Sequence, residues 1–209
     1  MSGLNKIATF QNRRDEVPNQ ELAKRLAETK DKKGIREIAE NLWHENKNVQ
    51  SDCLKVLYEI GYLQPELIAD HVGDFLRLLN CKNNRLVWGS MIALSTIAEI
   101  KAEDIFQYDN EIKKALETGS VITVDNGVKT LAIIASTKDE HRKKIFPYLL
   151  KHLGTCRPKE VPQHSEKILV AVNAKNKREF IDLLEKRMPD LRGSQVKRVN
   201  RVIKKAEKC

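Results

Sequence analysis

The sequence predicts an all-α fold, an α-solenoid of about five helical pairs, and two internal periodicities carry this prediction. A helical pattern with a leucine at a fixed position recurs every 37 residues. A second helical pattern with the same spacing precedes it in each copy. The only run with strand-like composition is Val121–Val124, and its place in the repeat makes it the start of a helix.

The second helix of each pair carries the clearest repeat. Its core positions are a small residue, a leucine four residues later and an isoleucine three residues after that. They are filled by Cys53, Leu57 and Ile60, then by Ser90, Leu94 and Ile97, then by Gly127, Leu131 and Ile134. Offsets of three and four residues place such side chains on one helical face, and the small residue allows close approach to a neighbouring helix.

The first helix of each pair repeats with two apolar positions one turn apart. These positions hold Ile38, Phe75, Ile112 and Leu149, and then Leu42, Leu79, Leu116 and Leu153. The predicted first helices span roughly Gly34–His44, Pro65–Asn80, Asp104–Thr118 and Glu140–Gly154. Turns rich in asparagine, or containing Gly119 and Ser120, separate the first three of these from their second helices.

The repeat pattern drifts toward the C-terminus. Ser165, Ile168, Leu169 and Val172 carry it one residue late, and a last copy at Val199, Val202, Ile203 and Ala206 follows a helix near Arg178–Arg187. Drift and added charge are typical of a terminal capping repeat. We therefore expect a single repeat domain over residues 19–209 with a basic C-terminal cap. We expect residues 1–18 to form a separate N-terminal segment, either partly ordered or a capping helix.

The second-helix pattern, Val-x-x-x-small-x-x-(Ala/Val/Thr)-Leu-x-x-Ile-(Gly/Ala), resembles the HEAT repeat of the armadillo-type superfamily. The resemblance covers residues 34–172 well and leaves the subfamily unassigned. Gln50, Val87 and Val124 stand where a charged residue is usual, and asparagines replace the usual Asp-Pro turn. The resemblance implies a right-handed superhelix whose second helices line a concave face where partners dock. It implies a fold more than a function.

Composition and charge limit the class of protein. The chain has 209 residues and a net charge of +9, with no apolar run near the ~18 residues of a membrane span. Residues 1–10 lack the apolar segment of a signal peptide, so we expect a cytoplasmic protein without a membrane span and with reduced cysteines. Residues 61–120 hold nine acidic and six basic residues, whereas residues 188–209 hold two acidic and seven basic residues.

The expected concave face predicts a non-enzymatic scaffold that binds a protein partner. The predicted partner-binding residues on the second helices are Lys55, Trp88, Ile92, Asp125 and Lys129. An exposed apolar groove with a tryptophan is typical of a binding surface. The alternative is that flanking repeats cover these side chains. The oligomeric state is not assigned.

A nucleic-acid-binding protein is the alternative function. Its candidate residues are Arg142, Lys143, Lys144, Lys197, Arg198, Arg201, Lys204, Lys205 and Lys208. Trp88 and Asp125 share one repeat position and resemble the aromatic and carboxylate pair of HEAT-like alkylpurine DNA glycosylases. However, no second aromatic wall is evident, and the surrounding region is acidic, which repels phosphates. We therefore assign no catalytic residues, and we expect any nucleic-acid binding to lack sequence specificity.

One group of residues has metal-ligand chemistry. His152 and Cys156 lie one helical turn apart and His164 follows, which would offer three ligands. The sequence provides no evident fourth ligand, and Pro158 and Pro162 leave the local geometry open. We therefore predict no metal site and no cofactor.

Overall fold

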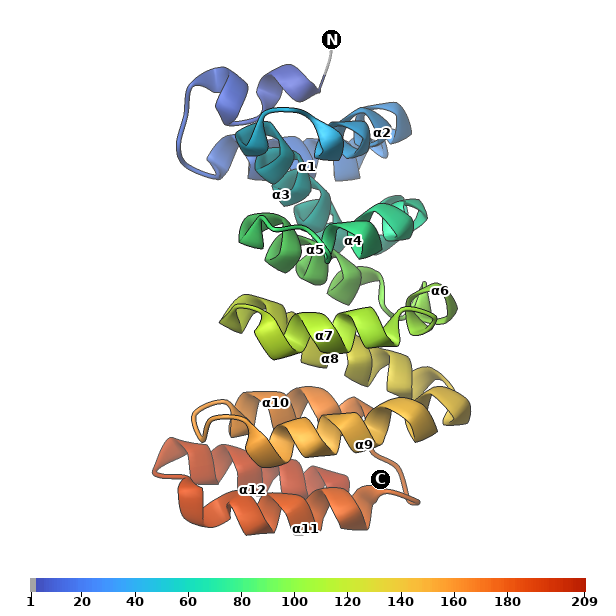
Figure 1. Cartoon of the computed structure of the whole chain (residues 1–209), viewed down its shortest axis with the longest axis vertical. Coiled ribbons are helices and arrows are strands. Elements are labelled where there is room, and N and C mark those ends of the chain that lie inside the picture. Colours follow the sequence, from blue (N-terminus) through green and yellow to red (C-terminus); the bar gives the residue numbers. More distant parts are fainter. Residues whose placement is uncertain (1–2) are drawn as a thin grey trace. The chain divides into compact units, whose positions relative to one another are not determined.

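The computed structural model describes residues 3–209, and within them every regular element is helical (Figure 1). The all-α prediction is confirmed, and Val121–Val124 opens a helix. The α-helices are α1 (Val17–Thr29), α2 (Lys32–Glu40), α3 (Lys47–Leu63), α4 (Val72–Leu78), α5 (Asn84–Ile97), α6 (Ala102–Phe106), α7 (Asp109–Thr118), α8 (Val121–Thr137), α9 (Asp139–Thr155), α10 (Val161–Ile168), α11 (Lys177–Arg187) and α12 (Ser194–Ala206). Short 3₁₀ turns occupy Leu4–Lys6, Thr9–Gln11, Asn41–Trp43, Pro65–Leu67, Ala69–His71, Leu169–Ala171 and Met188–Asp190. None of the described helices combines the length and the apolar character needed to cross a membrane.

The described residues group into two compact units, one ending at Gly127 and the other spanning Val128–Cys209. In the first unit, α3 packs against α1, α2 and α5, and α4 packs against α5 and α6. In the second unit, α10 packs against α9 and α12, and α11 packs against the same two helices. Within each unit, first helices therefore contact first helices and second helices contact second helices, as a stacked repeat requires.

The repeated apolar positions form the cores. Leu57, Leu94 and Leu131 have no exposed surface, and neither do the isoleucines that follow each of them by three residues. Burying a leucine side chain stabilises a fold by about 1.5–3 kcal/mol. The 37-residue register deduced from the sequence is therefore the register of the packing.

The repeat requires a small residue at one position because two helices approach closely there. A Cβ atom at Gly127 would lie 2.1 Å from Cδ1 of Leu116 on α7, which is closer than carbon atoms can pack. The equivalent Cys53 and Ser90 are both fully buried. A larger side chain at these positions would push the helix away from its neighbour.

The N-terminal caps of the second helices also recur every 37 residues. The side chains of Asn46 and Asn83 accept hydrogen bonds from the backbone N–H two residues ahead, at 2.9 and 3.1 Å. The Ser120 hydroxyl accepts from the N–H of Thr123 at 3.3 Å. These three residues are spaced by 37, so the caps, like the leucines, belong to the repeat.

Two first helices differ from their predicted extents. In place of one helix over Pro65–Asn80, two 3₁₀ turns precede the shorter α4. The interruption places Ile68, which is fully buried, against Gly61 of α3, where a Cβ would lie 2.8 Å from the Ile68 Cδ1 atom. Tertiary packing here overrides the helical periodicity.

The predicted helix over Asp104–Thr118 is likewise split, into α6 and α7, by a bend at Gln107 and Tyr108. Ile105 before the bend and Ile112 after it are both fully buried. The apolar spacing alone therefore did not reveal the break. The first-helix regions at Gly34–His44 and Glu140–Gly154 agree with α2 plus its following 3₁₀ turn and with α9.

The packing predicts the cost of truncating the repeated leucines. Leu94→Ala and Leu131→Ala should each lower the free energy of unfolding by about 2–5 kcal/mol, because each leaves a cavity in a closed core. Urea denaturation followed by circular dichroism measures this cost. Leu63→Ala is the matched control, since Leu63 is 55% exposed and its truncation should change stability little. Core variants as stable as the parent would contradict this register.

Candidate functional site

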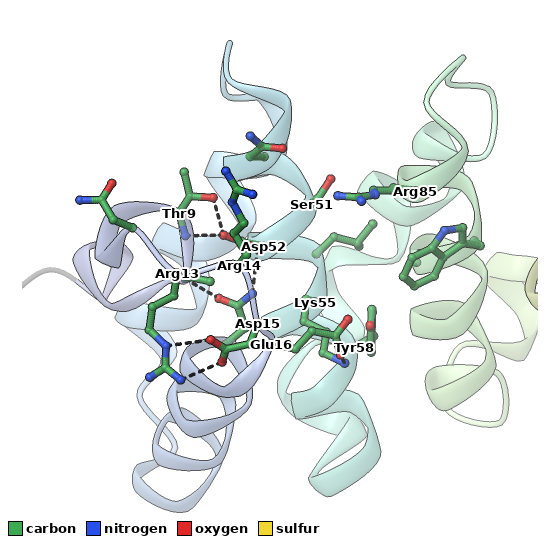
Figure 2. A pocket seen from close by; sticks show the side chains of 17 residues that line it. Thr9, Arg13, Arg14, Asp15, Glu16, Ser51, Asp52, Lys55, Tyr58 and Arg85 are labelled. Carbon is green, nitrogen blue, oxygen red and sulfur yellow. Dashed lines mark hydrogen bonds and ion pairs between the residues drawn. The ribbon is translucent and has the colours of Figure 1, made fainter.

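An open pocket of about 800 Å³ lies in the first unit, between residues 8–16 and helices α1, α3 and α5 (Figure 2). Helices α3 and α5 are second helices of consecutive pairs, the face predicted to bind a partner. Two of the predicted partner-binding residues, Lys55 and Trp88, line the pocket. The segment before α1 forms the opposite wall, so residues that lie outside the predicted repeat domain contribute to the site.

One carboxylate, that of Asp52 on α3, holds this segment in place (Figure 2). Its Oδ2 accepts hydrogen bonds from the backbone N–H and the hydroxyl of Thr9, at 2.8 and 2.6 Å. Its Oδ1 accepts from Nδ2 of Asn19 at 2.9 Å, and the Asn19 Oδ1 accepts from the N–H of Ala8 at 2.9 Å. Asn19 is only 2% exposed. The pocket wall is therefore attached to α1 and α3 by a connected polar network.

Lys55 lies in the pocket wall with most of its side chain covered. Its ammonium lies 2.7 Å from carboxylate oxygens of both Glu16 and Glu59, and 4.9 Å from the ring centroid of Tyr58. Burial lowers the pKa of Lys55, but the hydrogen bonds to Glu16 and Glu59 outweigh burial and raise it. The lysine thus stays charged, and its charge is already balanced by neighbours.

Aromatic side chains form the apolar part of the pocket. The rings of Tyr58 and Trp88 have centroids 6.2 Å apart and planes inclined by 55°. Beside Trp88, Gly89 brings α5 close to α3, because a Cβ there would lie 2.6 Å from Cδ2 of Leu54. Burial raises the pKa of Tyr58 to about 12, so its hydroxyl stays protonated. Tyr58 was not among the predicted partner-binding residues, although its position three residues after Lys55 on one helix places it near the same face.

Two exposed arginines at the pocket have no ion-pair partner within residues 3–209. These are Arg14, from the N-terminal segment, and Arg85, which extends from α5 toward Ser51 on α3 (Figure 2). In contrast, Arg13 pairs with Asp15 at 2.9 Å. The pocket therefore combines an aromatic wall with two cationic groups that remain able to pair with an acidic partner.

The other predicted partner-binding residues do not line this pocket. Ile92 is 7% exposed and packs within the protein. Asp125 and Lys129, both on α8, are half-buried, and burial lowers the pKa of Lys129. The aromatic neighbour of Trp88 is Tyr58, and the pocket lining does not include the carboxylate of Asp125 that a glycosylase-like arrangement would require.

The second unit brings together a different group of residues, His152, Cys156 and His164. One ligand atom from each lies within 4.8 Å of the others. The Nε2 of His152 and the Nδ1 of His164 are 3.1 Å apart. Burial, and then the neighbouring His164, lower the pKa of His152 to about 4, so its ring is neutral near pH 7. Burial raises the pKa of the Cys156 thiol, and Arg187 acts in the opposite direction.

Comparison with known proteins identifies the fold. No family model matches the sequence, and no curated protein matches it significantly. A designed armadillo repeat protein in complex with the peptide (KR)4 matches 90% of this chain and 86% of its own, with a TM-score of 0.71 and 16% identity. The chain has an armadillo/HEAT-like helical repeat fold.

Two further solved structures have the same fold. An engineered protein from the Northeast Structural Genomics Consortium matches 100% of this chain and 98% of its own, with a TM-score of 0.69 and 20% identity. A computationally designed armadillo repeat protein for modular peptide recognition matches 88% and 86%, with a TM-score of 0.68 and 16% identity. The α-solenoid deduced from the repeat is therefore confirmed. Sequence identities this low show a shared fold but do not show a shared function.

In this armadillo/HEAT-like fold, the candidate nucleic-acid residues are not all available. Arg198 pairs with Glu166 at 2.6 Å. Arg142 pairs with Asp139 and donates to the backbone carbonyls of Ser136 and Ala171, both at 3.2 Å. The remaining candidates have exposed side chains and are Lys143, Lys144, Lys197, Arg201, Lys204, Lys205 and Lys208.

The Asp52 network predicts a specific loss of stability. Asp52→Asn should cost about 1–3 kcal/mol, because an amide can accept on one side only and would turn its N–H donors toward Thr9 or Asn19. Urea denaturation measures the cost, and hydrogen exchange should show faster exchange at the Ala8 and Thr9 amides. Asp15→Asn is the control, since its pair with Arg13 is 45–49% exposed and should contribute little. Equal stability of the two variants would exclude an anchoring role for Asp52.

Proposed function

We propose that this protein is a non-enzymatic scaffold that binds an acidic segment of a protein partner in the pocket formed by residues 8–16, α1, α3 and α5. The observation that carries the proposal is the pair of arginines, Arg14 and Arg85, beside the Tyr58–Trp88 wall. Arginine and tryptophan are the residues most enriched among those that dominate binding energy at interfaces.

The charge distribution favours an acidic partner over a basic one. Asp52 is engaged by Thr9 and Asn19, and Glu16 by Lys55, so these carboxylates are already satisfied within the protein. Arg14 and Arg85 are not neutralised by any ion pair in the described chain. A peptide carboxylate that meets either guanidinium would gain a charge-assisted hydrogen bond without displacing an existing partner.

The structural neighbours support peptide binding as a use of this fold. One is in complex with the peptide (KR)4, and another was designed for modular peptide recognition. The (KR)4 peptide is basic, so the chemistry proposed for this chain differs from that of its neighbour. The alternative, nucleic-acid binding through α9 and α12, has weaker support, because Arg142 and Arg198 are already paired with carboxylates.

Selection from a random peptide display library tests the proposal. We expect the parent protein to enrich peptides that combine acidic residues with an aromatic or large aliphatic residue. Trp88→Ala should weaken their binding by about tenfold or more, consistent with a loss above about 1.4 kcal/mol at an anchoring residue. The double variant Arg14→Glu, Arg85→Glu should weaken binding to a similar extent, with an effect that diminishes as salt increases.

The matched control reverses charge elsewhere on the protein. Lys204→Glu with Lys205→Glu changes the charge by the same amount on α12 and should leave peptide affinity unchanged. The same four-unit charge change should abolish binding of a fluorescent oligonucleotide if α12 binds nucleic acid. Failure to enrich acidic peptides, or affinity that the pocket variants leave intact, would refute the proposal.

A further inference from the structure

We propose that His152, Cys156 and His164 form a binding site for one zinc ion, with a water molecule or an external ligand completing the coordination. This goes beyond the proposed scaffold function and concerns the second compact unit alone. The sequence contains three residues of metal-binding type but does not show whether their donor atoms lie close together. The fold brings one donor atom of each within 4.8 Å of the other two.

The local backbone explains why these donors converge. His152 lies in the last turn of α9 and Cys156 directly follows that helix, so the two are separated by one helical turn. Residues at this spacing share a helical face and can bind one metal, as the two histidines of the H-E-x-x-H motif do. The short connection over residues 157–160 then returns the chain to α10, which places His164 opposite them.

The distances suit a tetrahedral zinc site. Zinc–nitrogen bonds of about 2.0–2.1 Å place two nitrogens about 3.3 Å apart around a tetrahedral ion, and a zinc–sulfur bond of about 2.3 Å places nitrogen and sulfur about 3.6 Å apart. The two imidazole nitrogens already lie at 3.1 Å. The sulfur, within 4.8 Å of both, needs a shift of about 1.2 Å at most. Rotation of a side chain at a helix end supplies such a shift.

The surroundings hold the end of α9, which carries two of the three ligands. Arg187 of α11 donates to the carbonyls of Leu153 and Cys156, both at 2.8 Å, and so holds the end of α9. The Leu153 carbonyl also accepts a hydrogen bond from the Cys156 thiol at 3.5 Å. When the thiol loses its proton this hydrogen bond is lost, but the carbonyl still accepts the hydrogen bond from Arg187. Two neutral imidazoles and a thiolate leave a zinc complex with one positive charge. The carboxylate of Glu160 is close enough to act electrostatically on all three ligands, and it is itself paired with Arg157.

The competing explanation is an ordinary hydrogen bond between two imidazoles. That bond accounts for the 3.1 Å distance between His152 and His164, but it does not require a thiol beside them. A set of two nitrogens and one sulfur selects zinc and its thiophilic neighbours over magnesium or calcium, which prefer oxygen ligands.

Cobalt(II), a spectroscopic substitute for zinc, tests the proposal on the full chain after reduction and treatment with a chelator. We expect one equivalent to produce a thiolate-to-cobalt charge-transfer band and the intense visible bands of tetrahedral cobalt. One equivalent of zinc should displace it, and zinc should raise the melting temperature of the parent. An absence of these bands in the parent would overturn the proposal.

Matched variants locate the site. Cys156→Ser should abolish the charge-transfer band, and His152→Asn should weaken cobalt binding by more than the about 10–100-fold typical of losing an outer hydrogen-bond partner. His152 is partly exposed, so this second variant remains informative if the cysteine variant unfolds. Cys81→Ser, at another partly buried cysteine, and Cys209→Ser, at the exposed one, should keep the band. A band that survives in a folded Cys156→Ser variant would exclude the site.

Discussion

The fold depends on the burial of one leucine per repeat between stacked helices. A single helical pair exposes one apolar side and cannot bury it alone, so each pair is stable only against a neighbour. Leu57, Leu94 and Leu131 meet this requirement with no exposed surface. The small residue four positions earlier, such as Gly127, is the corollary, because the leucines reach a shared core only if the helices approach closely. The spacing of the sequence repeat, the position of the helix caps and the position of the buried leucines therefore all follow from the same packing requirement.

That constraint explains which parts of the fold could be predicted from sequence. Second helices obey local rules: a capping Asn46 or Asn83, an apolar stripe and a buried leucine all recur at the same spacing. The first helix predicted over Pro65–Asn80 does not, because Ile68, between two 3₁₀ turns, fills the space beside Gly61 of α3. Nothing in the local pattern around Pro65–Asn80 encodes that contact.

The candidate sites divide in the same way. Trp88 and Lys55 could be placed on the second-helix face, because their positions in the repeat define it. That Lys55 would be neutralised by Glu16 could not be foreseen, since Glu16 lies outside the repeat. Similarly, the spacing of His152 and Cys156 is visible in the sequence. The approach of His164 depends on the conformation of the connection after α9, which the prolines left undetermined.

Both sites occur where the repeat is irregular, and packing offers a reason. At regular positions of the repeat, packing against the neighbouring helix determines which side chain fits, so few of these positions can hold polar residues. Before α1 the described residues form two 3₁₀ turns in place of a helical pair, and residues 8–16 together with Asp52 bound the pocket there. After α9 the connection over residues 157–160 leads into α10, where His164 is fully buried beside the half-buried His152 and Cys156. Polar groups placed in an interior cost free energy unless they are paired. Asp52 is paired with Thr9 and Asn19, and His152 is paired with His164, so in both places the polar side chains find partners within their own unit. Zinc would bind the two ring nitrogens that now contact each other.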